Sequence, residues 1–153
     1  KNLTQQYAAI LGRSYPLVEA CGLEGAVTVI VAAGSPAQTI KSVLPALNNQ
    51  GAPTGLLRLR LFRPLPAKEI VSLLARPHIK RIVVVDRDIS AGLGGIFAQE
   101  LRALLQGCSF GGKIYELNLA GGVDFTPQLL RRGLEAVAAG SGEQGRIIWG
   151  VDL

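Results

Sequence analysis

The chain has 153 residues, of which 48% are hydrophobic and 18% are charged, and its formal net charge is +5. This length suits one domain with a full core and is too short for two domains of ordinary size. Basic residues are spread along the chain and aromatic residues make up 5%, which excludes the basic stripe and stacking platform of a nucleic-acid-binding protein.

Short runs of β-branched residues and leucine alternate with longer amphipathic runs, which predicts parallel strands joined by helices in an α/β sandwich. Ser35-Pro36 and Thr126-Pro127 each predict a helix start with a capping side chain. In chain order, we expect an extended edge segment at 16–21, a strand at 26–33, a helix at 36–49, a strand at 56–62, a helix at 64–75, a strand at 80–85, a helix at 96–106, a strand at 113–118, a helix at 127–139 and an apolar tail at 147–149 that docks on the domain or on a neighbour.

The ends and the surface predict a fragment of a longer polypeptide. The chain begins with Lys1 and contains no methionine. Its charged fraction is below the usual value of about 25%, which indicates that part of the surface lies against another domain. We expect one domain, with residues 1–14 as a linker or extension, 15–140 as the core and 141–153 as a tail. No apolar run approaches a membrane span and residues 1–7 are too polar for a signal peptide, so we expect a cytoplasmic domain without a membrane partner.

Two arginines interrupt the apolar strand at 56–62. Because side chains alternate along a strand, Leu57, Leu59 and Leu61 lie on one face, while Arg58 and Arg60 lie on the other. Burying unpaired guanidinium groups is costly, so the arginines require acidic partners or solvent. Two interpretations stay open: a strand near the sheet edge with solvated arginines, or a face that is closed by something outside the domain.

Further charged residues follow the carboxyl ends of two predicted strands. Arg63 follows one strand, and Asp86, Arg87 and Asp88 follow another, at the edge where an open α/β sheet keeps its ligand and partner contacts. We expect them to form an ion-pair network. Neighbouring arginines oppose the raised pKa that a catalytic carboxylate pair needs, so a structural or docking role is favoured over acid/base catalysis.

Glycines precede the predicted helix at 96–106. Backbone N–H groups at Gly92, Gly94 and Gly95 are weak candidates for phosphate binding, because glycine allows close approach and the amino end of a helix favours an anion. The segment lacks the Lys-Ser/Thr of a P-loop and follows the third strand, so a close helix-packing turn is the favoured interpretation. For the segment Gly121 to Asp124, a turn that leads into a helix is likewise the favoured interpretation, and a contact loop is the alternative.

No residue pattern indicates catalysis by this chain alone. His78 is the only histidine and follows Arg76-Pro77 in a predicted loop, and the Gly-x-Ser-x-Gly pattern is absent. Cys21 and Cys108 lack the spacing of a metal site and are expected to pack in the core. We therefore expect neither a catalytic residue nor a metal in this domain.

The chain resembles the second domain of pyruvate:ferredoxin oxidoreductases and of related 2-oxoacid:ferredoxin oxidoreductase alpha subunits, which has the transketolase carboxy-terminal-domain fold. The resembling segments are 12–15, 22–24, 55–66, 85–90 and 121–127, and the most specific is Gly-Leu-Leu-Arg-Leu-Arg-Leu-Phe-Arg-Pro-Leu-Pro at 55–66. The chain departs from the family at Leu65, where Phe is usual, and at Val123, where Arg is usual. The second departure weakens any anion contact from that loop.

The resemblance implies a three-layer α/β/α sandwich with a five-stranded mixed sheet in the order 1-3-2-4-5, whose first strand is antiparallel to the rest. It further implies an oligomeric enzyme that oxidatively decarboxylates a 2-oxoacid such as pyruvate to acyl-CoA and CO₂. That enzyme uses thiamine diphosphate, magnesium and coenzyme A, and it reduces ferredoxin or flavodoxin through iron–sulfur clusters. The implied role of this domain, which carries neither the thiamine site nor the cluster ligands, is assembly.

We hypothesise that contacts with other domains or subunits are made by Arg58, Arg60, Arg63, Asp86, Arg87, Asp88 and Asp124. Two other function classes stay open. One is the equivalent domain of another thiamine enzyme, such as transketolase or the beta subunit of a 2-oxoacid dehydrogenase, which the Arg-Pro-Leu-Pro and Asp-Arg-Asp segments disfavour. The other is a stand-alone module that binds a nucleotide or coenzyme A through residues 92–95.

Overall fold

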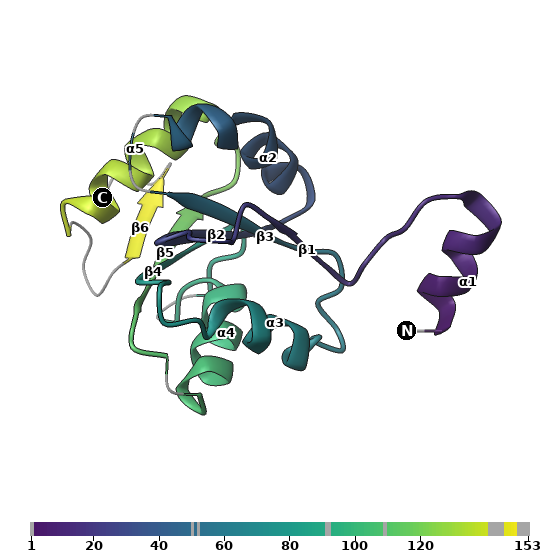
Figure 1. The fold of residues 1–153 in the computed structure, drawn as a ribbon. Coiled ribbons are helices and arrows are strands. Elements are labelled where there is room, and N and C mark those ends of the chain that lie inside the picture. The colour runs from purple at the N-terminus through teal and green to yellow at the C-terminus, as the bar shows by residue number, and fades with distance from the viewer. Residues whose placement is uncertain are drawn as a thin grey trace.

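The computed structural model describes residues 2–49, 51, 53–90, 93–108, 110–140 and 146–149. In chain order, the elements are α1 (Asn2–Leu11), β1 (Val18–Cys21), β2 (Thr28–Ala33), α2 (Gly34–Asn48), β3 (Thr54–Leu59), α3 (Ala67–Leu74), β4 (Arg81–Asp86), α4 (Ile96–Gln106), β5 (Lys113–Leu119), α5 (Pro127–Ala138) and β6 (Arg146–Trp149). Figure 1 shows a central sheet with α2 and α5 on one face and α3 and α4 on the other.

The sheet order is β1-β3-β2-β4-β5-β6. β1 pairs with β3 in antiparallel orientation, and all other neighbouring strands are parallel. The expected order of the first five strands and the antiparallel first strand are confirmed. The apolar tail does dock on the domain, but as a sixth strand: β6 pairs with β5, so it extends the expected five-stranded sheet by one strand.

Each face of the sheet has its own apolar core, because strand side chains alternate between faces. Leu57, Leu59, Val84 and Leu101 belong to the core beneath α3 and α4. The opposite core, beneath α2 and α5, includes Ile30, Ile40, Leu56, Val85, Leu117 and Leu130. The expected alternation is confirmed for Leu57, Leu59 and Arg58, which lies on the α2 face. The strand expected at 56–62 ends earlier, at Leu59, so Arg60 and Leu61 lie beyond β3.

The helix starts agree only partly with the sequence prediction. Thr126 caps α5, because its side-chain oxygen accepts the N–H of Leu129 at 3.1 Å. The predicted cap by Ser35 is wrong, since α2 begins at Gly34, two residues before the predicted start at Pro36, and has no side-chain cap. The helix predicted from Pro64 begins only at Ala67, because Pro66 disfavours the helical conformation at the preceding residue, Leu65.

Residues 2–11 form a helix within the expected linker or extension. In Figure 1, α1 stands apart from the sheet and its covering helices, joined to β1 by an extended segment. Within the described ranges, no helix has the length and hydrophobicity that crossing a membrane requires.

Candidate inter-domain interface

Arg58 and Arg60 meet an acidic partner within the domain. The antiparallel register places Glu19 of β1 opposite Arg58 of β3. The Glu19 carboxylate pairs with Arg60 at 2.5 Å, with Arg58 at 3.6 Å, and with Lys41 of α2. We call these four residues the Glu19 cluster. The edge strand β1 thus supplies one acidic partner to both arginines, Arg58 within β3 and Arg60 immediately after it.

The Glu19 cluster has more positive than negative charge. Its three cations share one carboxylate, and the exposed side-chain fractions are 45% for Lys41, 27% for Arg60 and 19% for Arg58. The hydrogen bond from Lys41 lowers the pKa of Glu19, and this effect together with Arg60 exceeds the opposing effect of burial. The cluster therefore carries a net charge of about +2 at the surface, which would favour an anionic group over a cationic one.

An aromatic contact connects this cluster to the amino-terminal helix. The Arg60 guanidinium carbon lies 5.2 Å from the centre of the Tyr15 ring, within the range of a cation–π interaction. The Tyr15 ring in turn meets the Tyr7 ring of α1 edge-on, with centroids 5.5 Å apart. The basic surface over β3 thus continues into the aromatic residues beside α1.

At the carboxyl edge of the sheet, polar side chains of β4 and β5 bind the amino end of α4. Asp86 Oδ2 accepts the N–H of Phe97 at 3.1 Å, and Glu116 Oε2 accepts the N–H of Gly95 at 2.8 Å. Glu116 also pairs with Arg102 and accepts a hydrogen bond from Asn118. We call Asp86, Arg102, Glu116 and Asn118 the buried cap. Its carboxylates occupy the position where the helix amino end favours negative charge.

This arrangement bears on the phosphate hypothesis. The Gly95 N–H is bound to Glu116 and the Gly94 N–H is bound to the Ser90 carbonyl, while Gly92 lies outside the described residues. A Cβ atom on Gly95 would come within 2.8 Å of Asn118 Oδ1 and 3.1 Å of Asp86 Oδ2. Two carboxylates at this turn would also repel a phosphate. The described glycines fit a close packing turn and do not fit a phosphate site.

Glu116 is fully buried, and its charge is stabilised by three donors. Burial alone would raise the pKa of Glu116, but hydrogen bonds from Gly95, Arg102 and Asn118 lower it to about 2. The carboxylate is therefore ionised at neutral pH. Because its partners are backbone and side-chain donors of the same domain, Glu116 acts as a structural acceptor and not as a general base.

The predicted ion-pair network between Arg63 and residues 86–88 is wrong for the described part of the chain. Arg63 pairs instead with Glu100 of α4 at 2.5 Å, and its guanidinium lies over the Phe62 ring. Asp86 is buried, and its carboxylate oxygens accept hydrogen bonds from backbone N–H groups, including that of Asp88. Competition from these nearer donors explains why Asp86 does not pair with an arginine.

The carboxyl edge nevertheless presents an open groove. It has a volume of about 470 Å³ and is lined by Phe62, Asp86, Arg87, Asp88, Ile96 and Phe97. Arg87 reaches the Val123 carbonyl at 3.2 Å, which joins this groove to the loop that carries exposed Asp124. Of the carboxyl-edge residues proposed from the sequence, the structure thus exposes Arg63, Arg87, Asp88 and Asp124 and buries Asp86.

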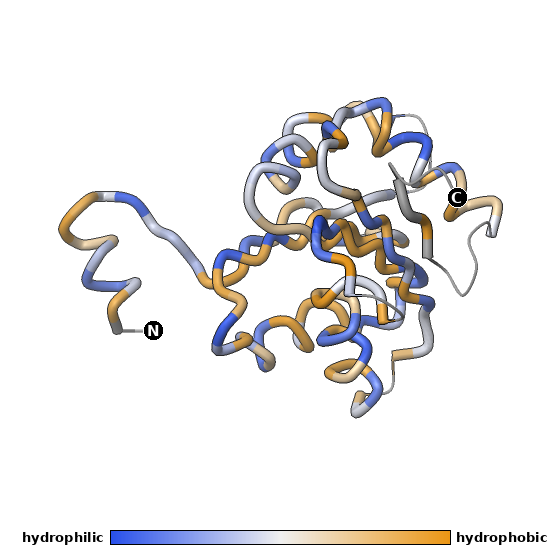
Figure 2. The backbone as a smooth tube through the Cα atoms, turned by 180° about the vertical axis from the view of Figure 1, so that it is seen from behind, coloured by the Kyte–Doolittle hydropathy of each residue, from blue (hydrophilic) through white to orange (hydrophobic). Residues whose placement is uncertain are grey.

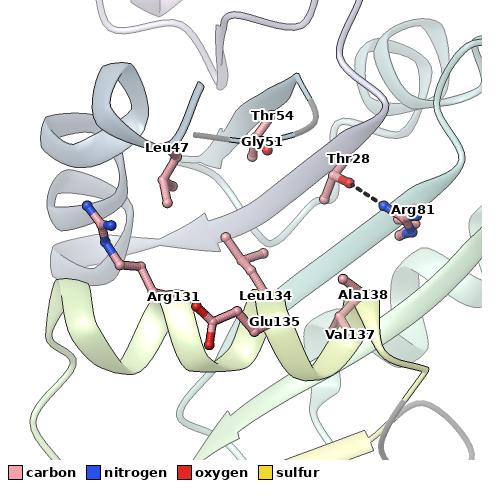
Figure 3. Close-up of a pocket in the computed structure, with 10 residues that line it drawn as sticks. All are labelled: Thr28, Leu47, Gly51, Thr54, Arg81, Arg131, Leu134, Glu135, Val137 and Ala138. Carbon is pink, nitrogen blue, oxygen red and sulfur yellow. Dashed lines mark hydrogen bonds between the residues drawn. The ribbon is translucent and has the colours of Figure 1, made fainter. Parts of the chain in front are cut away.

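A second cavity, of about 330 Å³, lies at the opposite, amino edge of the sheet. Figure 3 shows it between the amino ends of β2, β3 and β4 and helix α5, with Leu134 pointing inward and Arg81 donating to Thr28. Its lining residues include neither a histidine nor a cysteine. This cavity could hold a small ligand but offers no nucleophile with an adjacent base.

Three further residues were considered in the sequence: His78, Cys108 and Cys21, whose Sγ donates to Glu19 Oε1 at 3.8 Å. His78 is exposed, as predicted, and its Nε2 lies 3.3 Å from the Leu23 carbonyl. Both cysteines are free and half-buried, so the prediction that they pack in the core is met only in part, by Cys21 at the margin of the core beneath α2 and α5. Among the described residues, no group of three or more His, Cys, Asp or Glu side chains is placed to hold a metal ion.

Sequence reasoning missed the residues that complete both clusters. Glu116 and Asn118 could have been found from the alternation in 115–119, where they alternate with Tyr and Leu residues and so predict a polar face at the end of an otherwise apolar strand. Glu19 gave no comparable signal, because its pairing depends on the register between β1 and β3.

The comparisons with known proteins agree with this fold. The sequence matches the protein family described as pyruvate:ferredoxin oxidoreductase core domain II over residues 26–130. It is 37% identical to pyruvate synthase subunit PorA of Methanothermobacter thermautotrophicus over 80% of this chain and 31% of that protein. It is 32% identical to ketoisovalerate oxidoreductase subunit VorA of Pyrococcus abyssi over 82% of this chain and 32% of that protein.

A solved structure has a similar fold. It is the 2-oxoglutarate:ferredoxin oxidoreductase from Magnetococcus marinus with 2-oxoglutarate, coenzyme A and succinyl-CoA bound, with a TM-score of 0.57 and 20% identity over 86% of this chain and 21% of that chain. The chain spans about a third of the length of the two curated relatives named above. On the strength of the family match and the relatives, the chain belongs to the pyruvate:ferredoxin oxidoreductase core domain II family.

Proposed function

We propose that this chain is the structural and assembly domain of a thiamine-diphosphate-dependent 2-oxoacid:ferredoxin oxidoreductase, with pyruvate as the expected substrate. The intact enzyme would form acyl-CoA and CO₂ and reduce ferredoxin. Thiamine diphosphate, magnesium and iron–sulfur clusters would be held elsewhere in that enzyme, and coenzyme A would bind to the intact form. A cytoplasmic location and an oligomeric enzyme are part of the same proposal.

The family membership is the single observation that carries this proposal. Relatives named for pyruvate and for ketoisovalerate both match this chain at above 30% identity, so the domain is shared by enzymes that are named for different 2-oxoacids. Substrate choice in such enzymes is therefore expected to lie outside this domain.

The charge distribution supports a docking role for the surface. Glu19 neutralises only one of the three cations in its cluster, and Arg87, Asp88 and Asp124 are exposed at the carboxyl edge. Arg58, Arg60 and Arg63 keep hydrogen-bonding capacity for acidic groups of a partner, because a guanidinium has five donors. Asp86, which the sequence placed among the contacts, would act indirectly by holding the loop that carries Arg87 and Asp88.

The experiment is a combined substitution in the intact oxidoreductase. We expect Arg58→Gln/Arg60→Gln/Arg63→Gln to reduce the fraction of assembled enzyme seen by analytical ultracentrifugation, with 2-oxoacid-dependent ferredoxin reduction falling in the same proportion. The matched control is Arg132→Gln, which removes an exposed arginine from α5 on another part of the surface. Unchanged assembly and activity in the triple variant would contradict a docking role for these arginines.

A further inference from the structure

Large exposed hydrophobic residues gather on α1. Leu3 and Ile10 are about 80% exposed, and Tyr7 and Leu11 are about half exposed. Their spacing places them along one side of the helix, because residues three and four apart lie on the same face. Figure 2 shows this mixture of hydrophobic and hydrophilic residues on a helix that stands outside the body of the domain. An apolar helix face exposed in this way is the pattern of a segment that docks in a groove.

The apolar face of α1 is continuous with the residues that lead into β1. Leu3, Thr4, Tyr7 and Tyr15 line a shallow depression of about 320 Å³. Tyr7 and Tyr15 contact each other, and the Arg60 guanidinium lies over the Tyr15 ring. The surface therefore has an apolar, aromatic centre with the basic Glu19 cluster at its side. Protein interfaces commonly have this form, in which a polar rim surrounds an apolar centre.

The charges argue for one kind of partner. Helices that lie on membranes are usually rich in lysine and arginine on their polar face, whereas α1 contains neither acidic nor basic residues. A symmetric contact with a second copy would bring two positively charged Glu19 clusters toward each other, which like-charge repulsion disfavours. An apolar groove with acidic residues at its rim satisfies both the aromatic centre and the positive cluster.

We propose that α1 and Tyr15 dock into an apolar, acid-rimmed groove on a part of the oxidoreductase that lies outside these 153 residues. This inference rests on the proposed function. The chain spans about a third of its curated relatives, so such enzymes have ample further surface to supply the groove. Leu3, Tyr7 and Ile10 would fill the groove, and Arg60 and Lys41 would face its acidic rim.

The first test is site-specific photo-crosslinking in the intact oxidoreductase, with the photoreactive residue p-benzoylphenylalanine placed at Ile10. The matched control places the same residue at Gln5, which is exposed and lies on the other side of α1. We expect mass spectrometry to find crosslinks from position 10 to an apolar segment flanked by Asp or Glu outside this chain, at a yield about tenfold above that from position 5. Crosslinks mainly to a second copy of this chain, or no excess over position 5, would overturn the inference.

The second test is amide hydrogen exchange of α1 in the same enzyme. A docked helix exchanges slowly, so we expect Tyr7→Asp/Ile10→Asp to accelerate exchange throughout α1 by about tenfold or more. The conservative variant Tyr7→Phe/Ile10→Leu should retain the protection. Equal exchange in the three proteins would overturn the docking of α1. Failure of the proposed function would appear earlier, because the wild-type chain would then not co-purify with an enzyme that reduces ferredoxin.

Discussion

The buried cap and the Glu19 cluster both combine carboxylates with arginine, but they differ in how completely the charges are matched. In the buried cap, the Glu116 carboxylate accepts from the Gly95 N–H, from Asn118 and from Arg102, all within the domain. In the Glu19 cluster, one carboxylate serves three partly exposed cations. The Glu116 charge is therefore stabilised within the fold, although Asn118 Oδ1 in the same cap has no hydrogen-bond partner among the described residues, whereas the Glu19 cluster keeps a net positive charge at the surface.

Because of this difference, we expect the buried cap to contribute to the stability of the fold and the Glu19 cluster to contribute to the proposed assembly. If a fully buried carboxylate loses its donors, it is left unsatisfied in a low-dielectric interior. The same holds for buried donors that lose their carboxylate. Solvated ion pairs at a surface contribute little to stability, typically below about 1 kcal/mol. We therefore expect changes in the buried cap to destabilise the domain and changes in the Glu19 cluster to affect its contacts with other parts of the proposed enzyme.

The largest effect is expected from acid. The pKa of Glu116 is about 2 in the folded chain, against 4.5 for an unperturbed glutamate. A carboxyl group whose folded pKa is depressed stabilises the fold above its unfolded pKa, and this contribution is lost as pH falls through the folded pKa. Between about pH 4.5 and 2, the chain should lose about 3 kcal/mol of unfolding free energy from this group. Urea denaturation at a series of pH values measures the loss.

The control for this prediction is Glu116→Gln, which cannot titrate at this position. Its stability should depend less on pH across the same window than that of the wild type. An identical pH dependence in both proteins would show that Glu116 is not the group responsible.

At neutral pH, Glu116→Gln should destabilise the chain by about 2 kcal/mol, because Arg102 loses a charged partner and Gly95 keeps only a neutral acceptor. Denaturant unfolding checks this value. The double variant Glu116→Gln/Arg102→Gln removes both charges, so it should be no less stable than the single variant. Wild-type stability in the single variant would contradict a structural role for the buried cap.

Gly95→Ala should destabilise by about 1–2 kcal/mol, because the added Cβ would collide with the Asn118 and Asp86 side chains and push them from the amino end of α4. Gly111→Ala is a suitable comparison, since a Cβ there meets nothing within 4 Å. Thermal unfolding of the two variants measures the difference. Equal melting temperatures would mean that the turn does not need close packing.

The smallest effect is expected from Glu19→Gln, which should destabilise the isolated chain by about 1 kcal/mol by leaving three cations without their shared carboxylate. Raising the salt concentration should reduce the difference from wild type, because exposed charges are screened. Glu24→Gln, at an exposed turn position, is the control. If Glu19→Gln lowered the free energy of unfolding as much as Glu116→Gln does, the two clusters would not differ in their contribution to stability.

Local sequence patterns predicted much of the fold but little of the charge pairing. Alternation in β3 correctly placed Arg58 opposite Leu57 and Leu59, and Thr126-Pro127 correctly marked the start of α5. The strand order followed from the resemblance to a family, since local patterns do not determine which strands become neighbours. The tail was expected to dock, yet its pairing with β5 depends on tertiary contacts that four residues cannot reveal.

The candidate interface could be predicted only in part, because its ion pairs also depend on tertiary contacts. Exposed arginines were identified from their strand, but Glu19 lies about 40 residues from Arg60 in sequence and meets it only through the β1–β3 register. Asp86 was expected at the surface and is buried, because local backbone N–H groups compete for its oxygens. The apolar spacing of Leu3, Tyr7 and Ile10 was a detectable helix signal that the prediction of a linker did not use.

We propose that the Glu19 cluster serves assembly while the buried cap serves folding. The most direct measurement is the assembled fraction of the intact oxidoreductase carrying Arg58→Gln/Arg60→Gln, determined by analytical ultracentrifugation on protein whose domain is shown to be folded by circular dichroism. We predict a folded domain and a reduced assembled fraction. Full assembly of this folded variant would contradict the claim.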